Sequence, residues 1–367
     1  MVHPTLAAAR SLGPTIAERS SEIEASGRLP HDLVDLVRPT GAFRQYVPAD
    51  LDGPGVTAWE SLEVTEEYGF HDGAFGWCIA IASTTSLLSS YLPEQYAKEI
   101  FGNVDTIAGG FAAPGGRATP VDGGLRVSGR WQWGSGSRHC NWIGGGSRLV
   151  DVDGKTTPRA DGLVMPFVFF DPADVELIDN WDVSGLSGTG SSDYQVSDVF
   201  VPEGRWAQVG LLACGVASAA VGIARRSIHE LVELAQDKRP QGSRRTLRER
   251  TPIQADVAIA EAKLTSAWLF MADAVGGAWD MAAAGNDMDL ETKRLLRLSA
   301  THATQTAAEV TELMYKAAGG AAVYKTSPIQ RCFRDVFVAT QHAMIAPRTY
   351  ELAGRIKLGL DTDPAGL

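Results

Sequence analysis

Two hydroxyl side chains alternate with glycines at positions 134–137, Gly-Ser-Gly-Ser, directly after Trp133. Glycine lets the backbone approach a ligand closely, and serine hydroxyls both donate and accept hydrogen bonds. Apolar and polar residues alternate through the preceding segment 125–133, which predicts a strand with one buried and one polar face. A large aromatic beside close backbone and hydroxyls is suited to the flat ring system of a flavin. Taken alone, the pattern is more typical of a core strand that ends in a Gly/Ser turn.

Two histidines could carry proton chemistry, because histidine titrates near neutral pH. His342 stands in the apolar run 338–348, VATQHAMIAPR, where it could deprotonate a phenol or an amine or hydrogen-bond to a reactive intermediate. His71 stands beside Asp72 between two predicted helices and could line a cavity. A histidine in an apolar helix is more often a satisfied core residue, and one at a helix cap is more often structural.

The composition is that of an ordinary globular protein. The chain has 367 residues, 44% hydrophobic and 21% charged, with a formal net charge of -11. This charge argues against nucleic-acid binding and against anionic membrane surfaces. No run reaches the ~18 apolar residues of a membrane span, and residues 1–10 lack a signal-peptide start, so we expect a cytoplasmic protein. The four cysteines are isolated, without the paired spacing of a zinc site, and we expect no metal.

The chain divides into three regions by pattern. Helical periodicity dominates residues 1–105, glycines and short alternating runs dominate 106–205, and helical periodicity returns over 206–367. Long helices are predicted over 211–236, 253–284, 290–318 and 334–358, and their short connections indicate a four-helix bundle. The predicted class is α+β, with an N-terminal α-helical domain, a middle β-domain and a C-terminal bundle. No GxGxxG follows a strand, so a Rossmann-type nucleotide site has no support.

Three motifs resemble the acyl-CoA dehydrogenase superfamily. The segment 129–135, GRWQWGS, is similar to the flavin-facing strand of its β-domain, with Trp131 in place of the usual lysine. The run WDVSGLSGTGSSD at 181–193 is similar to a second loop of that domain, with Ser187 where an arginine is common. The run 317–336 carries a Gly-Gly pair followed by Arg-Asp, as the superfamily does. The Trp-x-Trp-x-Ser-Gly variant resembles the flavin-dependent monooxygenase branch in particular.

The resemblance implies a set of flavin-binding residues spread over the whole chain. In the segment 111–118 the superfamily's Thr-Glu-Pro is replaced by Ala-Ala-Pro, which leaves only backbone contacts there. The basic segment 238–250 would bring an arginine to flavin phosphate, although a solvated loop is the usual explanation of such a run. The Gly-Gly turn would reach the flavin of a neighbouring subunit. The implied residues are Phe111, Ala113, Trp133, Gly134, Ser135, Ser137, Thr189, Gly190, Ser191, Arg244, Gly319, Gly320 and Arg334.

A missing carboxylate distinguishes between dehydrogenase and oxygenase. Acyl-CoA dehydrogenases need a carboxylate base, commonly nine residues after the motif arginine. Counting from Arg334 gives Ala343, and the alternative location, 210–222, contains no acid. His342 stands where the monooxygenase branch carries an active-site histidine, and Ser135 would donate a hydrogen bond near flavin N5.

The resemblance therefore implies the oxygenase component of a two-component monooxygenase. It would take reduced FAD or FMN from a separate reductase and use O2, through a C4a-hydroperoxyflavin, to oxidise a small aromatic or a nitrogen- or sulfur-containing substrate. His342, Ser135 and His71 are the catalytic candidates, and a homotetramer is expected. Two alternatives stay open, namely an acyl-CoA dehydrogenase-like enzyme with a non-standard base and a catalytically silent flavin- or ligand-binding scaffold.

Overall fold

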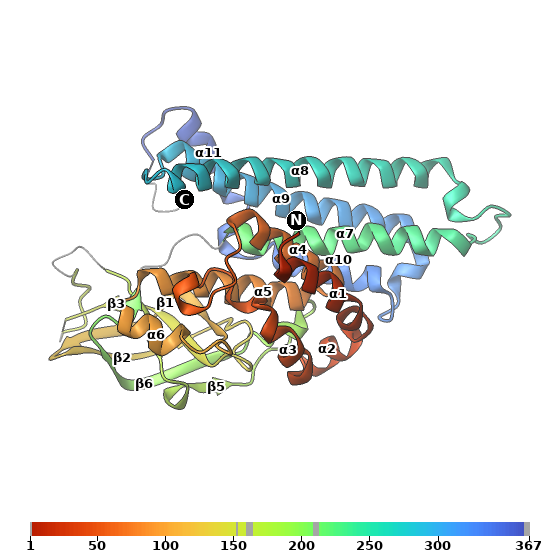
Figure 1. Ribbon diagram of the computed structural model, residues 1–367. Helices are drawn as coiled ribbons and strands as arrows, with labels where there is room; N and C mark the ends of the chain where they lie inside the picture. The colour runs from red at the N-terminus through yellow and green to blue at the C-terminus, as the bar shows by residue number, and fades with distance from the viewer. Residues whose placement is uncertain (1, 152, 159–163, 208–212, 363–367) are drawn as a thin grey trace.

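The computed structural model describes residues 2–151, 153–158, 164–207 and 213–362. Helices come first in the chain, strands follow, and helices return. Figure 1 shows the sheet beneath one end of a long helical layer. The predicted α+β class, with helical regions before and after a β-region, is confirmed. None of the helices in the described residues is long and apolar enough to cross a bilayer.

The N-terminal helices surround one fully buried helix, α5. It begins where the Asp72 carboxylate accepts a hydrogen bond from the backbone N–H of Phe75 at 2.9 Å, a helix N-cap. Every residue of α5 is buried, as its lack of charged residues requires. The helices are α1 (Pro4–Glu18), α2 (Ser20–Ser26), α3 (His31–Val37), α4 (Ala58–His71), α5 (Gly73–Ser86) and α6 (Glu94–Phe101).

The strands form one mixed seven-stranded sheet in the order β5-β6-β2-β1-β3-β4-β7. The central strand β1 pairs antiparallel with β2 and parallel with β3. The strands are β1 (Ala108–Val121), β2 (Gly124–Trp131), β3 (Trp142–Leu149), β4 (Phe167–Phe170), β5 (Glu176–Ile178), β6 (Asp193–Pro202) and β7 (Trp206–Ala207).

Trp131 is the centre of the sheet core. It is fully buried, stacks on Tyr194 with ring centroids 5.3 Å apart, and donates from Nε1 to the Gly146 carbonyl at 2.7 Å. A Cβ on Gly145 would lie 2.4 Å from the Trp131 ring, which explains the glycines of β3. The predicted alternation therefore holds as far as Trp131.

The prediction fails at Trp133, which we expected on the buried face of the strand. Strand β2 ends at Trp131, and Trp133 is 55% exposed with a left-handed backbone (φ 60°). The physical reason is non-local. The Gly134 N–H bonds to the Ser192 carbonyl at 3.0 Å, and this bond turns the chain out of the sheet.

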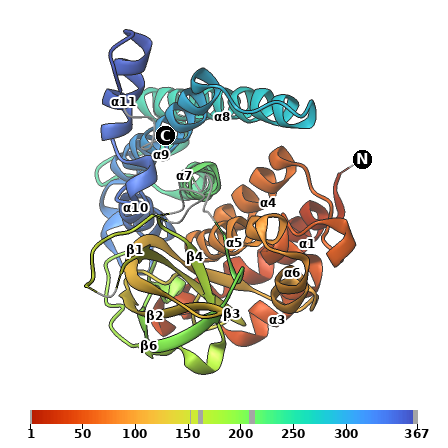
Figure 2. The same ribbon diagram turned by 90° about the vertical axis from the view of Figure 1, so that its left-hand side faces the viewer.

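The C-terminal helices pack around α7, which Figure 2 shows near the centre of the molecule, between α4 and α5 on one side and α9 and α10 on the other. The predicted helix 290–318 is confirmed at its bounds, and the predicted helices 211–236 and 253–284 are confirmed to within two residues at each end. Positions 211 and 212 lie outside the described residues. The helices are α7 (Ala213–Asp237), α8 (Thr251–Ala283), α9 (Leu290–Ala318), α10 (Pro328–Ala339) and α11 (Arg348–Lys357).

The single helix predicted over 334–358 is wrong. Helix α10 ends at Ala339, and a short 3-10 turn, η9 (Ala343–Ile345), separates it from α11. Pro347 lacks the N–H that would continue a helix, and the His342 side chain caps the 3-10 turn. His342 therefore lies in a connection rather than inside an apolar helix.

Candidate active site

Ser135 lies at the junction of three elements. The turn that carries it is tied to the 186–192 loop by two backbone bonds, Gly134 N–H to Ser192 at 3.0 Å and Gly136 N–H to Thr189 at 2.8 Å. The Ser135 hydroxyl is buried, lies 2.8 Å from the Ser191 hydroxyl, and accepts a hydrogen bond from Trp77 Nε1 of α5 at 3.2 Å. The structure thus brings the two predicted flavin loops together.

These hydroxyls form a row whose direction is fixed by its ends. Trp77 Nε1 can only donate, and the Leu186 carbonyl, which accepts from Thr189 Oγ1 at 2.8 Å, can only accept. The hydroxyl oxygens of Thr189 and Ser191 are 2.7 Å apart, so the row is continuous. Each group therefore donates its hydrogen bond to the next one, in the order Trp77, Ser135, Ser191, Thr189 and the Leu186 carbonyl. The Ser135 proton is therefore directed at Ser191, and a flavin would have to compete with Ser191 for it.

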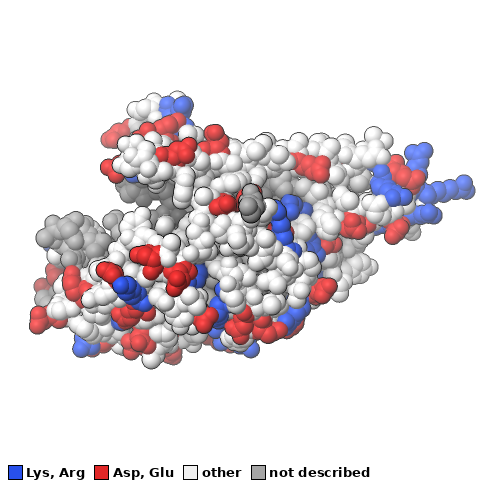
Figure 3. Space-filling model, viewed as in Figure 1, with Lys and Arg blue, Asp and Glu red and all other residues white. Residues whose placement is uncertain are grey.

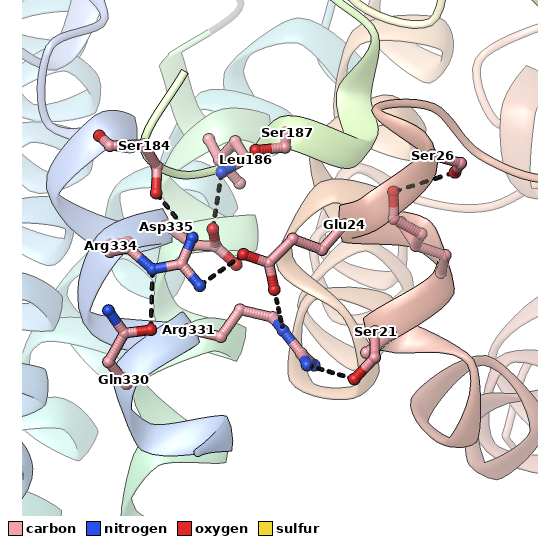
Figure 4. Close-up of polar contacts among 12 residues, drawn as sticks. Ser21, Glu24, Ser26, Ser184, Leu186, Ser187, Gln330, Arg331, Arg334 and Asp335 are labelled. Atoms are coloured by element: carbon pink, nitrogen blue, oxygen red, sulfur yellow. Dashed lines mark hydrogen bonds and ion pairs between the residues drawn. The ribbon is translucent and has the colours of Figure 1, made fainter. Parts of the chain in front are cut away.

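Asp335 fixes the loop that carries this row. Its Oδ1 accepts a hydrogen bond from the Leu186 N–H at 2.6 Å, and Leu186 has a left-handed backbone (φ 52°). Figure 4 shows this contact between α10 and the loop. Gly190, another predicted site residue, also has a left-handed backbone (φ 53°) and ends the same short turn. Burial raises the pKa of Asp335 to about 7, an effect that the neighbouring Asp72 increases and the Leu186 bond opposes.

His342 packs against Trp77, the residue whose indole N–H bonds to Ser135. The two rings meet edge to face with centroids 5.6 Å apart. Burial, aided by the charge of Arg297, lowers the pKa of His342 to about 4, so the imidazole is neutral at pH 7. Because Nδ1 accepts from the Met344 N–H at 3.4 Å, the neutral ring carries its proton on Nε2. This arrangement favours His342 as a hydrogen-bond donor over a base.

Trp77 is the site residue that sequence reasoning missed. It is buried in α5, a segment whose uniform apolarity predicted only core, and nothing in its local pattern distinguishes it from Phe75 or Ile79. Its hydrogen bond to Ser135 spans 58 residues of chain. Only tertiary packing makes it the link between Ser135 and His342.

An aromatic wall stands beside the Ser135 turn. The exposed Trp133 ring meets Phe111 edge to face at 5.5 Å, and Phe111 lies where β1 bulges away from β3. Ala113 is exposed in that bulge. Trp133 is a non-glycine residue in the left-handed backbone region, a conformation that costs of order 1–3 kcal/mol. Backbone strain of this kind concentrates at ligand sites.

Two buried hydroxyls near the turn have no partner. Ser137 Oγ and Ser192 Oγ make no hydrogen bond in the described part of the chain. A buried polar atom without a partner is unfavourable, so a polar ligand edge at this place would stabilise both. The exposed indole of Trp133, the backbone of the Gly134 turn and these hydroxyls together fit a flavin ring, which has a flat apolar face and a polar edge.

His71 lies apart from this site. It ends α4, and its Nε2 is 3.1 Å from Glu67 Oε1. It lines a separate small cleft between α4, α7 and α10 together with Asp72, Arg226 and Asp335. The structure does not bring it to Ser135 or His342.

Arg334 is occupied within the chain. Its guanidinium donates to Gln330 at 2.9 Å and to the Ser184 carbonyl at 2.7 Å, and it pairs with Glu24 at 2.5 Å. Figure 4 shows Glu24 bridging Arg334 and Arg331, which joins α2 to α10. These contacts assign Arg334 to holding the chain together.

Arg244, Gly319 and Gly320 lie at the far tip of the bundle, away from the sheet. The loop after α7 forms this tip, where Figure 3 shows basic side chains gathered, and Lys238 Nζ donates to the Ala318 carbonyl at 2.7 Å beside the Gly-Gly turn. All three predicted residues are exposed. One chain therefore does not place them with Ser135, and only a second subunit could use them at a flavin.

Comparison with known proteins identifies relatives of this chain. Residues 214–347 match the family model described as acyl-CoA dehydrogenase, C-terminal domain. The chain is 31% identical over 366 residues to indole-3-acetate monooxygenase of Pseudomonas putida, covering 95% of this chain and 92% of that protein. It is 28% identical to the oxygenase subunit HsaA of the flavin-dependent monooxygenase of Rhodococcus jostii, covering 95% and 97%.

Solved structures show the same fold. The HsaA monooxygenase from M. tuberculosis superposes with a TM-score of 0.90 at 25% identity over all of both chains. XiaF from Streptomyces sp., solved in complex with FADH2 and glycerol, superposes with a TM-score of 0.90 at 22% identity, covering 97% of this chain and 95% of that one. The chain belongs to the flavin-dependent monooxygenases of the acyl-CoA dehydrogenase superfamily.

Proposed function

We propose that this protein is the oxygenase component of a two-component system: it receives reduced FAD or FMN from a separate reductase and places one oxygen atom of O2 on a small aromatic substrate. The hydrogen-bonded row from Trp77 through Ser135 and Ser191 to Thr189, with neutral His342 packed against Trp77, carries the proposal. The positions that hold a carboxylate base in dehydrogenases carry none, because residue 343 is alanine and 210–222 contains no acid.

The bound flavin would supply the reducing electrons and the site at which O2 is activated. The residues of the chain would bind the flavin and keep water away from the reaction. Trp133 and Phe111 would hold the flavin ring through their aromatic surfaces, and the Gly134 turn would offer it close backbone. Ser135, hydrogen-bonded to Ser191, would offer it a hydroxyl. The buried surroundings of Trp77 exclude water, which limits unproductive loss of activated oxygen.

His342 would act on the substrate or on the developing oxygen charge by donating from Nε2. With its pKa lowered to about 4, the ring stays neutral over the physiological range, so Nε2 offers a hydrogen bond without the ring carrying a positive charge. Two relatives are named indole-3-acetate monooxygenase and one is a resorcinol hydroxylase, which supports a small aromatic substrate.

We also propose that the protein assembles as a homotetramer through α8. Apolar side chains are exposed to solvent at intervals along this 33-residue helix, including Ile259 (48% exposed), Leu269 (59%) and Trp279 (45%). Exposed apolar side chains over this length favour burial against other copies. Light scattering after gel filtration should give four chains for the wild type and fewer for Leu269→Asp; a monomeric wild type would contradict this.

Stopped-flow spectroscopy tests the oxygenase. The protein is mixed anaerobically with reduced FMN or, separately, reduced FAD, and then with oxygenated buffer. We expect a spectral phase that persists before the oxidised flavin spectrum returns, and a slower return than with free flavin. Reoxidation at the rate of free flavin with both cofactors would refute the proposal, and the next experiment would be anaerobic bleaching of bound FAD by an acyl-CoA.

A further inference from the structure

One buried arginine of the C-terminal helices has no counter-ion in the described residues. Arg297 of α9 is 6% exposed, and its Nε has no hydrogen-bond partner. In the described chain no ion pair and no carboxylate offsets its charge: burial lowers the pKa of Arg297, the charge of Arg348 lowers it further, and only the Cys214 thiol opposes this. A buried charge is strongly unfavourable unless it is paired.

Other buried arginines in this protein have hydrogen-bond partners for their guanidinium groups. Arg294, one turn earlier on α9, is equally buried, at 6% exposed, and makes two hydrogen bonds to Glu291 at 2.6 and 2.7 Å. Arg44 and Arg205 also have an unpartnered Nε, but their terminal nitrogens bind backbone carbonyls or Glu99. Arg297 alone among these four lacks any such partner in the described residues.

The elements around Arg297 place its unpaired charge near the proposed site. Helix α9, which carries Arg297, packs against α7 and against η9, the turn that follows His342. Gln305 of α9 donates to the Ile345 carbonyl of η9 at 3.4 Å. The charge of Arg297 also contributes to lowering the pKa of His342. Thr301, one turn along the same face of α9, is fully buried and its Oγ1 also lacks a partner. The segment 208–212, which precedes Cys214, has the sequence QVGLL and contains no acid.

We infer that Arg297 binds the carboxylate of the substrate, and that the substrate is therefore a small aromatic acid. This inference rests on the proposed function for the identity of the site. A hydrogen bond links Ser135 to Trp77 and ring packing links Trp77 to His342, while the charge of Arg297 acts on His342. In the proposed arrangement the carboxylate binds at Arg297, beyond His342 from Ser135. The aromatic ring then lies between the carboxylate and the flavin, beside His342. A guanidinium is suited to this task because it binds a carboxylate through two parallel N–H bonds.

Binding to the flavin-free protein tests the inference without any turnover. Benzoate, phenylacetate and indole-3-acetate are each compared with the corresponding neutral amide by calorimetry and by the shift in melting temperature. We expect at least one acid to bind wild type ~10- to 100-fold more tightly than its amide, the range of a hydrogen bond to a charged group. Arg297→Gln should remove this preference, and Arg297→Lys should keep part of it.

Two controls separate recognition from structural support. Arg294→Gln removes an equally buried arginine that is already paired, and it should leave the preference for acid over amide unchanged. Arg297→Met should not lower the melting temperature of the ligand-free protein, because it removes an unpaired buried charge.

The inference is overturned if no acid binds better than its amide, if Arg297→Gln weakens acid and amide equally, or if Arg297→Met destabilises the ligand-free protein as an ion-paired residue would. The proposed function fails separately, through reoxidation at the rate of free flavin in the stopped-flow experiment. A wild type that oxygenates neutral aromatics as well as acids would leave the oxygenase intact and refute only the role of Arg297.

Discussion

Replacing Asp335 by asparagine should stabilise the protein above neutral pH and have little effect at pH 5. Asp335 is buried, and its Oδ1 accepts the Leu186 N–H at 2.6 Å, a bond that an asparagine carbonyl can also accept. Burial raises the pKa of the carboxyl from 3.8 to about 7, with Asp72 adding to the shift and Arg334 and Arg331 opposing it. The native protein therefore holds a proton that the unfolded chain has already lost.

The sign of the effect follows from proton binding. Between pH 3.8 and about 7 the native state binds more protons than the unfolded state, so the free energy of unfolding falls as pH rises. Above pH 7 the full cost of the buried charge is present, about 4 kcal/mol for a shift of about 3 pKa units. Since a buried amide has its own desolvation cost, we expect Asp335→Asn to gain about 2–4 kcal/mol at pH 8.5.

Urea unfolding of both proteins at pH 5 and pH 8.5 measures this difference. The exposed Asp198 provides a matched control, because Asp198→Asn should show the same difference from wild type at both pH values. An Asp335→Asn difference that does not change with pH, or a loss of stability at pH 8.5, would show that folding does not raise the pKa of Asp335 and would refute the reasoning.

Three further predictions concern the site. Ser135→Ala should keep the fold but lower the coupling of oxygen consumption to product by roughly 10²-fold, because it removes the hydroxyl nearest the proposed ring edge; unchanged coupling in an oxygen-electrode assay would exclude Ser135 from the mechanism. His342→Ala should reduce the rate of product formation by ~10²–10⁴-fold at saturating substrate, measured chromatographically, whereas His71→Ala should keep normal turnover because His71 lies in a separate cleft. Arg334→Ala should lower the free energy of unfolding by ~2 kcal/mol or more by breaking its bonds to Ser184 and Glu24, with some loss of flavin retention; equal urea midpoints for variant and wild type would contradict this.

The broad architecture could be predicted because it depends on local patterns. Helical periodicity over 290–318 gives α9 at its observed bounds, and the alternation over 125–133 gives β2 as far as Trp131. The glycine-serine turn at Ser135 and the loop of Thr189 and Ser191 were picked out as flavin-binding by their resemblance to family motifs, because the local pattern alone is also typical of a core strand and turn. These features are encoded within a few residues of each other.

The sequence by itself therefore determined the order of helices and strands, the two motif-bearing loops of the proposed site and the lack of an acid at the positions where dehydrogenases carry their base. The tertiary structure decided which distant residues meet there. Trp77 joins Ser135 to His342 only because the buried helix α5 packs against the sheet, and Arg297 is unpaired only because α9 is enclosed by its neighbours. Periodicity predicts that a side chain is buried, but what it contacts depends on how separate elements pack, and no local pattern contains that information.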